Sequence, residues 1–147
     1  MERRCPGLPA GVPRVTGISF NSCGYGARLL DQGEDMSETL FSKIINREIP
    51  ADIVYEDELC VAFRDVNPQA PLHVLVVPKR PFARLTHATE ADQGLLGHLL
   101  LKSGQVAREQ GYDEFRLVVN NGPTAGQSVY HLHIHVLAGR AFAWPPG

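Results

Sequence analysis

Residues 131–137 read HLHIHVL, and this stretch indicates which face of the expected sheet packs on the core and which face carries polar side chains. It holds three of the six histidines of the 147-residue sequence, His131, His133 and His135. Because successive side chains of a β-strand point to opposite faces, the alternation predicts a strand with the three imidazoles on one face and the apolar residues between them on the other. The apolar face is expected to pack on a core, and the histidine face is expected to carry chemistry.

Four further strands are expected before this one, each rich in β-branched or aromatic residues. These four strands are Ile53–Glu56, Cys60–Arg64, His73–Pro78 and Phe115–Asn120, and the histidine strand, residues 131–138, is the fifth. Asp57 and Glu58 separate the first two strands as a hairpin turn does. Because the strands follow one another in hairpin-like succession and do not alternate with helices, the sequence predicts an α+β fold with a five-stranded antiparallel sheet.

Two helices complete the predicted fold. A short one follows Thr39 as its cap and ends before Pro50. A long one is capped by Thr89, with Asp92 at the third position inside it and Gly111 just past its end. One side of the long helix is apolar and is expected to pack on the core; it carries Leu95, Leu96, Leu99, Leu100, Val106 and Ala107. His87 and His98 are expected at the surface, without a functional role.

The first 35 residues differ in composition from the rest. They contain six of the 14 glycines and none of the histidines, and they show no sustained helical or strand period. We predict a disordered leader or upstream extension over residues 1–35 and a single domain over residues 36–147. Four arginines and one acidic residue up to Leu30 leave an organelle transit peptide as the alternative.

Composition narrows the classes of function. A net charge of -2 argues against sequence-independent binding to the backbone of nucleic acid. No apolar run reaches the ~18 residues that a membrane-spanning helix needs. The three cysteines, Cys5, Cys23 and Cys60, are an odd number without CxxC spacing, which favours a reducing compartment. We therefore expect a cytoplasmic protein, or an organellar one if residues 1–35 are a transit peptide.

The row of histidines suits two chemistries. In a straight strand the Cα atoms of His131 and His135 are ~13 Å apart, so all three imidazoles cannot bind one zinc ion, although two of them with His73 as a third ligand remain a candidate set. Nucleophilic attack is favoured, because an imidazole with a pKa near 6.5 is largely neutral at pH 7 and needs no separate base. We expect no metal and no cofactor.

Phosphorus is the expected target, because the loop before the row resembles a phosphate cradle. Residues 121–130 read NGPTAGQSVY. Gly122 and Gly126 allow the backbone to approach a ligand, successive N–H groups of the loop can form an anion nest, and Ser128 offers a hydroxyl. Next to three aligned histidines, this loop predicts a site for a small phosphate compound.

The same residues carry a family resemblance. HLHIHVL fits the alternating pattern of the histidine triad (HIT) superfamily, and GQSVYHLHIHVLAGR with the terminal WPPG resembles its HINT branch, the purine nucleoside phosphoramidases. LFSKIINREIPA, VAFRDVNPQAPLHVLVVPK and LVVNNG extend the resemblance over residues 39–147. It implies a homodimer that hydrolyses AMP-N linkages, such as AMP-lysine, through a nucleotidyl-histidine intermediate.

The resemblance also implies roles for individual residues. His133 matches the nucleophile, His135 and Ser128 match positions near the leaving amine, and His131 and His73 match histidines that orient their neighbours. The expected nucleotide contacts are the apolar walls Phe41, Ile44, Phe63 and Val66, the ribose acceptor Asp65, the polar contact Asn120, and the phosphate cradle Gly126, Gln127 and Ser128. Trp144 is expected to reach toward the site of the second subunit.

Two other functions remain as alternatives. One is a non-catalytic purine-nucleotide adaptor or sensor, which has no need of a reactive imidazole at His133. The other is a dinucleoside polyphosphate hydrolase, which the Ser128-Val129-Tyr130 sequence and the WPPG terminus disfavour within the superfamily.

Overall fold

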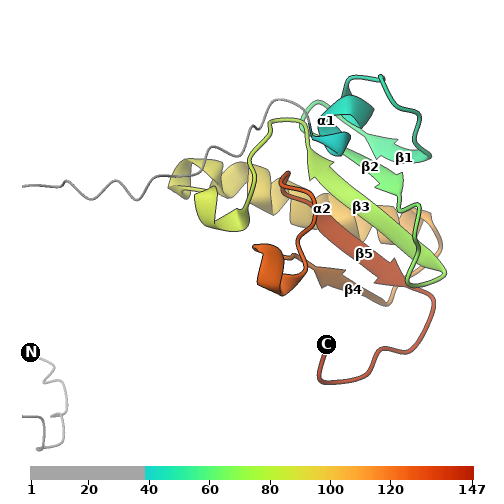
Figure 1. Ribbon diagram of the computed structural model, residues 1–147. Helices are drawn as coiled ribbons and strands as arrows, with labels where there is room; N and C mark the ends of the chain where they lie inside the picture. The colour runs from blue at the N-terminus through green and yellow to red at the C-terminus, as the bar shows by residue number, and fades with distance from the viewer. Residues whose placement is uncertain (1–38) are drawn as a thin grey trace, which may run out of the picture. The chain divides into compact units, whose positions relative to one another are not determined.

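The computed structural model describes residues 39–147; the predicted leader, residues 1–35, lies outside this described part. These residues form two α-helices and five strands, and Figure 1 shows how they are arranged. The helices are α1 (Leu40–Ile45) and α2 (Gln93–Glu109), and the strands are β1 (Ile53–Glu56), β2 (Cys60–Arg64), β3 (Leu72–Pro78), β4 (Phe115–Val118) and β5 (Ile134–Ala138). No helix of the described residues is long and apolar enough to span a membrane.

All five strands belong to one antiparallel sheet, as the sequence predicts. Their order is β1-β2-β3-β5-β4, so the strand that carries the histidine motif lies beside the central strand. In the pairing of β3 with β5, Leu75 is opposite His135 and His73 is opposite Leu137. His73 and His135 are therefore diagonal neighbours on adjacent strands, close enough for long side chains to touch.

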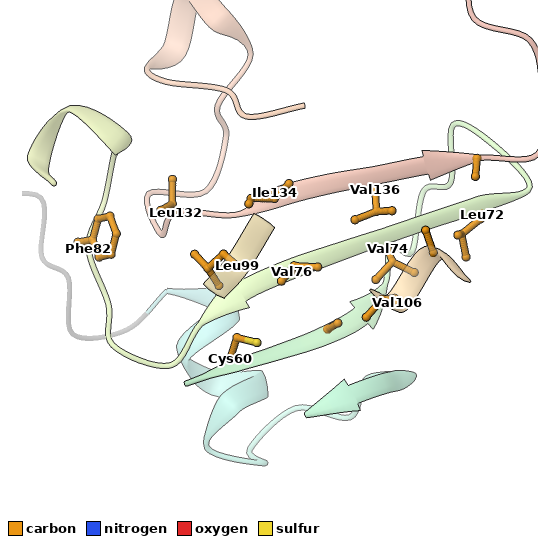
Figure 2. Close-up of a cluster of buried hydrophobic side chains, with 13 residues drawn as sticks. Cys60, Leu72, Val74, Val76, Phe82, Leu99, Val106, Leu132, Ile134 and Val136 are labelled. Atoms are coloured by element: carbon orange, nitrogen blue, oxygen red, sulfur yellow. The ribbon is translucent and has the colours of Figure 1, made fainter. Parts of the chain in front are cut away.

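The main core lies between the sheet and α2 (Figure 2). Alternate residues of the central strands point to this side, and the leucine and valine side chains of α2 meet them. Its buried members include Cys60, Ala62, Leu72, Val74, Val76, Leu99, Val106, Leu132, Ile134 and Val136. Because Ile134 and Val136 are committed to this core, the histidines between them must face the other side of the sheet.

The opposite face of the sheet is covered by α1. Phe41 and Ile44 of this helix pack on alternate residues of β2 and β3, namely Val61, Phe63, Leu75 and Val77. Thr39 begins the helix as predicted, because its hydroxyl accepts a hydrogen bond of 3.1 Å from the Ser42 N–H. The small core under α1 thus borders the histidine face.

The long helix begins differently from the prediction in one detail. A 3-10 turn over Glu90–Asp92 precedes α2, and Asp92 Oδ2 accepts hydrogen bonds from the backbone N–H of Thr89 (2.8 Å) and from its hydroxyl (3.1 Å). Gly111 follows the helix with a φ of 89°, the left-handed conformation that ends many helices. Leu99, Val106 and Ala107 are buried as expected, whereas Leu100 is 53% exposed, because it lies about 100° around the helix from Leu99.

The predicted histidine strand was too long by three residues. β5 begins at Ile134, so His131 and His133 lie in the extended segment before it. The ladder stops because β3 ends at Pro78, which has no N–H to donate. The Leu132 N–H donates to the Phe82 carbonyl instead, at 2.8 Å. β4 similarly ends at Val118, two residues before the predicted end.

Candidate active site

A pocket of about 690 Å³ opens on the α1 side of the sheet. Its walls are mainly apolar side chains of α1 and β2, and its polar groups come from the end of β2, the 121–130 loop and the histidine segment. Eight residues expected at the site line it: Phe41, Ile44, Phe63, Asp65, Val66, Ser128, His133 and His135. Val66 lies at the rim with a fully solvated side chain, 99% exposed, whereas Phe41, Ile44 and Phe63 are buried.

One nitrogen of His133 is available in this pocket. The ring Nδ1 lies 2.8 Å from the backbone carbonyl oxygen of His131, which can only accept, so Nδ1 carries the proton and donates. Nε2 then holds the lone pair. The ring is held edge-on against Phe41, at 5.0 Å between centroids, and against His135, at 4.9 Å. The backbone thus selects the tautomer that a nucleophilic imidazole requires.

His131 is part of the framework of the site. Its Nε2 donates to the Pro78 carbonyl at 2.8 Å, which leaves Nδ1 to accept from the Thr39 hydroxyl at 3.2 Å. Both ring nitrogens are therefore occupied, and the side chain is 1% exposed. His131 ties the segment before β5 to the end of β3 and to the start of α1, so its position orients His133, in keeping with the expected role.

His73 and His135 form a second fixed pair. The Gln69 N–H donates to His73 Nδ1 at 3.1 Å, so the proton of a neutral His73 ring is on Nε2. That Nε2 lies 2.9 Å from His135 Nδ1 and 3.4 Å from Asp65 Oδ2, and it donates over the shorter distance. The proton of His135 is therefore on its Nε2, a buried atom without a hydrogen-bond partner among the described residues. His135 presents an unused donor beside the lone pair of His133.

Burial keeps all four imidazoles neutral. Loss of solvation is the largest cause that lowers the pKa of His73, His131 and His133 below the usual 6.5. For His135, burial together with repulsion from His133 and His73 lowers the pKa to about 4. The lone pair on His133 Nε2 is thus unprotonated at pH 7 without help from a separate base.

The free energy of unfolding is expected to fall as the pH is lowered from 6.5 toward 4. Since the pKa of His135 is about 4 in the folded chain and near 6.5 in an unfolded one, the unfolded state binds more protons in this range. Urea unfolding at pH 7 and pH 5 measures the loss. The His135→Asn protein should lose less stability between these pH values, and the exposed-site control His87→Gln should behave as wild type. Equal wild-type stabilities at both pH values contradict this assignment.

Most polar groups of the 121–130 loop form hydrogen bonds that stabilise the conformation of the loop. Gln127 is buried; its Oε1 accepts from the Gly122 N–H (2.9 Å), and its Nε2 donates to the carbonyls of Ala83 (2.6 Å) and Val129 (3.0 Å). Its backbone N–H donates to the Gly122 carbonyl, and that of Gly126 donates to the Pro123 carbonyl. The expected three-residue phosphate cradle is therefore reduced to the N–H and hydroxyl of Ser128, while Gln127 positions the loop.

Two other expected residues lie outside the pocket lining. The Asn120 side chain lies near Gly126, where its Nδ2 would be 3.7 Å from a Cβ added to that glycine. This places Asn120 against the loop that carries Ser128. Trp144 is 84% exposed near the C-terminus and contributes nothing to the walls of the pocket within one chain.

The structure adds three residues that the sequence did not reveal as parts of the site. Thr39, Gln69 and Pro78 hold the imidazoles of His131 and His73 through the contacts described above. Thr39 had a sequence signal only as a helix cap. The other two act through backbone atoms, which leave no trace in the residue type.

The acidic and imidazole groups of the pocket do not fit a metal ion. Asp65, His73 and His135 bring ligand atoms within 4.8 Å of one another. However, the Gln69 N–H occupies the Nδ1 lone pair of His73, so the proton sits on Nε2, the atom that would have to bind the ion. Hydrogen bonding among these residues therefore accounts for their arrangement.

Comparison with known proteins places this arrangement in a family. The model of the HIT domain matches residues 46–142. An uncharacterized HIT-like protein of Synechocystis is 64% identical over 111 residues, which cover 75% of this chain and 97% of that protein. The 14 kDa zinc-binding protein of Zea mays is 49% identical over 116 residues, 77% of this chain and 91% of its own length.

Solved structures agree with the sequence matches. A HIT family hydrolase from Legionella pneumophila superposes with a TM-score of 0.73 at 44% identity, over 75% of this chain and all of that one (100%). A Zn-bound histidine triad family protein from Mycobacterium smegmatis has a TM-score of 0.60 at 30% identity, over 68% of this chain and 73% of that one. With a family model over most of its length and relatives of this similarity, the chain belongs to the HIT domain family and has the fold of HIT family hydrolases.

Proposed function

We propose that the protein hydrolyses purine nucleoside 5'-phosphoramidates, the reaction of the HINT branch. The observation that carries the proposal is the neutral His133, whose Nδ1–H is bound to the His131 carbonyl so that its Nε2 lone pair is left for the pocket. A pure nucleotide binder has no need of such a group. A phosphoramidase uses it to attack phosphorus.

The reaction proceeds in two displacements. His133 Nε2 forms a bond to the α-phosphorus while the P–N bond to the amine breaks, which leaves the nucleotide on the imidazole. The departing nitrogen takes up one proton, which solvent supplies through the exposed Ser128 hydroxyl, while the buried Nε2–H of His135 donates a hydrogen bond to the same nitrogen. Water then attacks the same phosphorus and gives one proton to solvent, the P–N bond breaks to restore the neutral His133 imidazole, and the nucleoside monophosphate leaves.

The remaining pocket groups suit a purine nucleoside. Phe41, Ile44 and Phe63 form an apolar slot for a flat base. Asp65 accepts one hydrogen bond from the Asn67 N–H at 2.8 Å, so its other lone pairs are left for the two ribose hydroxyls. The Ser128 N–H and hydroxyl lie on the phosphate side, where negative charge increases during attack.

The decisive experiment compares substrates on the purified full-length protein. AMP-lysine and GMP-lysine phosphoramidates should both be hydrolysed, with release of the nucleoside monophosphate. A dinucleoside polyphosphate should be turned over much more slowly. Binding of AMP without turnover of either phosphoramidate would favour the adaptor or sensor function, and faster cleavage of the polyphosphate would favour the alternative hydrolase.

Turnover is expected to persist after metal removal. The mechanism uses only His133, Ser128 and His135, and the hydrogen bond on His73 Nδ1 opposes an ion in the pocket. Exhaustive dialysis against EDTA should therefore leave phosphoramidase activity within about twofold of the untreated protein. Loss of activity that stoichiometric zinc restores would show that the pocket works through a metal. The name of the maize relative, a zinc-binding protein, is a reason for this control.

We further infer that two copies of the chain form a symmetric dimer. β1 and β4 are the edges of the sheet, and Leu100 and Leu101 of α2 are 53% and 75% exposed. Trp144 is then free to reach the site of the second copy, as the HINT resemblance implies. Light scattering at micromolar concentration should give twice the chain mass of 16.1 kDa, and a monomer mass contradicts the inference.

A further inference from the structure

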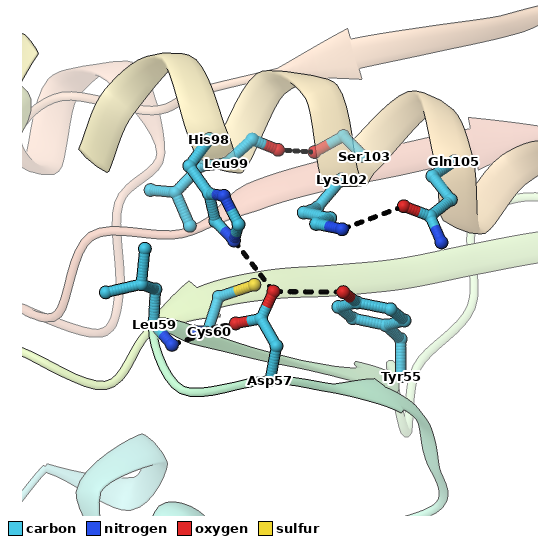
Figure 3. A network of polar contacts seen from close by, with 9 residues as sticks. All are labelled: Tyr55, Asp57, Leu59, Cys60, His98, Leu99, Lys102, Ser103 and Gln105. Carbon is cyan, nitrogen blue, oxygen red and sulfur yellow. Dashed lines mark hydrogen bonds and ion pairs between the residues drawn. The ribbon is translucent and has the colours of Figure 1, made fainter. Parts of the chain in front are cut away.

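A second cluster of reactive side chains lies on the other face of the sheet from the pocket (Figure 3). It joins Asp57 in the β1–β2 turn, Cys60 at the start of β2 and His98 in α2. A carboxylate oxygen, the thiol sulfur and a ring nitrogen lie within 4.8 Å of one another. Cys60 belongs to the core under α2, so the cluster is separate from the site of His133. No motif in the sequence connects these three residues.

The carboxylate of this cluster is oriented by its own turn. Asp57 Oδ1 accepts two backbone hydrogen bonds, from the N–H groups of Leu59 and Cys60, each at 2.8 Å. Oδ2 accepts from the Tyr55 hydroxyl at 2.9 Å and faces His98 Nε2 at 2.7 Å. In metal sites, hydrogen bonds from neighbouring groups to a ligating carboxylate hold it in the orientation that binds the ion.

Access to the cluster is from the solvent side. The Cys60 side chain is fully buried, at 0% exposure, and forms the floor. The side chains of Asp57 and His98 are 23% and 25% exposed and form the mouth. Because the carboxylate and the imidazole are 2.7 Å apart, an ion reaches the sulfur beneath them only when this contact opens.

We propose that Asp57, Cys60 and His98 bind a zinc ion, with water as the fourth ligand. One thiolate, one imidazole and one carboxylate are the ligand types of zinc, and the sulfur disfavours magnesium and calcium. Ligands at about 2.0–2.3 Å from zinc in a tetrahedron are about 3.3–3.8 Å apart, so the His98–Asp57 contact opens by somewhat less than about 1 Å when the ion binds. The Cys60 thiol proton is released to solvent. His98 Nε2 faces the Asp57 carboxylate and so carries the ring proton in the metal-free chain; when Nε2 binds the ion, this proton is lost to solvent and Nδ1 takes one up.

Cobalt titration of metal-free, reduced full-length protein tests the site directly. Co²⁺ should bind with one equivalent, and it should produce a thiolate-to-cobalt charge-transfer band together with the visible bands of a four-coordinate ion. Zinc should displace it. The Cys60→Ser protein should lose the charge-transfer band, while a control with Cys5→Ser and Cys23→Ser should keep it.

Two further variants separate this site from the pocket and from a folding defect. His98→Gln changes a partly exposed helix residue and should weaken cobalt binding at least tenfold; zinc, which should raise the melting temperature of wild type, should no longer do so in this variant. His133→Ala should titrate as wild type. The proposal is overturned if no cobalt binds, if the charge-transfer band survives Cys60→Ser or disappears with Cys5 and Cys23, or if His133→Ala removes binding.

Discussion

The His133→Ala protein is expected to hydrolyse AMP-lysine at least about 10⁴-fold more slowly than wild type, which corresponds to about 5.5 kcal/mol of activation barrier. His133 provides the attacking lone pair. His131 cannot replace it, because both of its nitrogens are hydrogen-bonded to Thr39 and Pro78. Single-turnover measurement of amine release gives the rate of the chemical step.

Nucleotide binding should change far less than turnover in the same variant. The apolar slot and Asp65 are unaltered, so the affinity for AMP measured by calorimetry should stay within about tenfold. The exposed histidine variant His87→Ala serves as the matched control and should keep full activity. In wild type, quenching without acid followed by peptide mass spectrometry should place the nucleotide on His133. An adduct on His135 or Ser128, or turnover by His133→Ala within tenfold of wild type, means that the roles must be reassigned.

Replacing Leu99 with alanine should destabilise the folded chain by about 2–5 kcal/mol. Leu99 is 0% exposed and, together with Val106 of the same helix, belongs to the core between α2 and the sheet (Figure 2). Its loss removes buried apolar surface and leaves a cavity that the strands cannot close without breaking their register. A chemical unfolding curve at pH 7 measures the change, which is a large share of the stability of an ordinary domain.

The matched control is Leu85→Ala, in the segment before α2. Leu85 is 42% exposed, so the same deletion of side-chain atoms should cost less than about 1 kcal/mol. Similar losses in the two variants would show that α2 does not provide the main core. A loss above about 2 kcal/mol for Leu99→Ala alone supports the assignment.

The strand alternation was readable from the sequence because it is a local property. HLHIHVL assigns Ile134 and Val136 to one face and His135 to the other whatever the sheet contacts, and the core under α2 agrees. The extent of β5 was not readable in this way. The pairing of β5 with β3 ends near Pro78, which has no N–H to donate. Pro78 lies on a different strand, 53 residues before His131, so no local pattern around His131 predicts this end.

The distinction between local and tertiary properties also applies to the His133 pocket and to the cluster of Asp57, Cys60 and His98. The sequence by itself determined the five strands, the two helices and the identity of the histidine motif, because periodicity, caps and a long run of matching residues act over short distances along the chain. Only the tertiary structure decided which nitrogen of His133 is free, that Gln127 serves the loop, and that His98 meets Asp57 from 41 residues away. Tautomers and ligand clusters depend on the atom that each ring faces, and in this chain those atoms belong to backbone carbonyls and side chains that the fold brings together from distant segments.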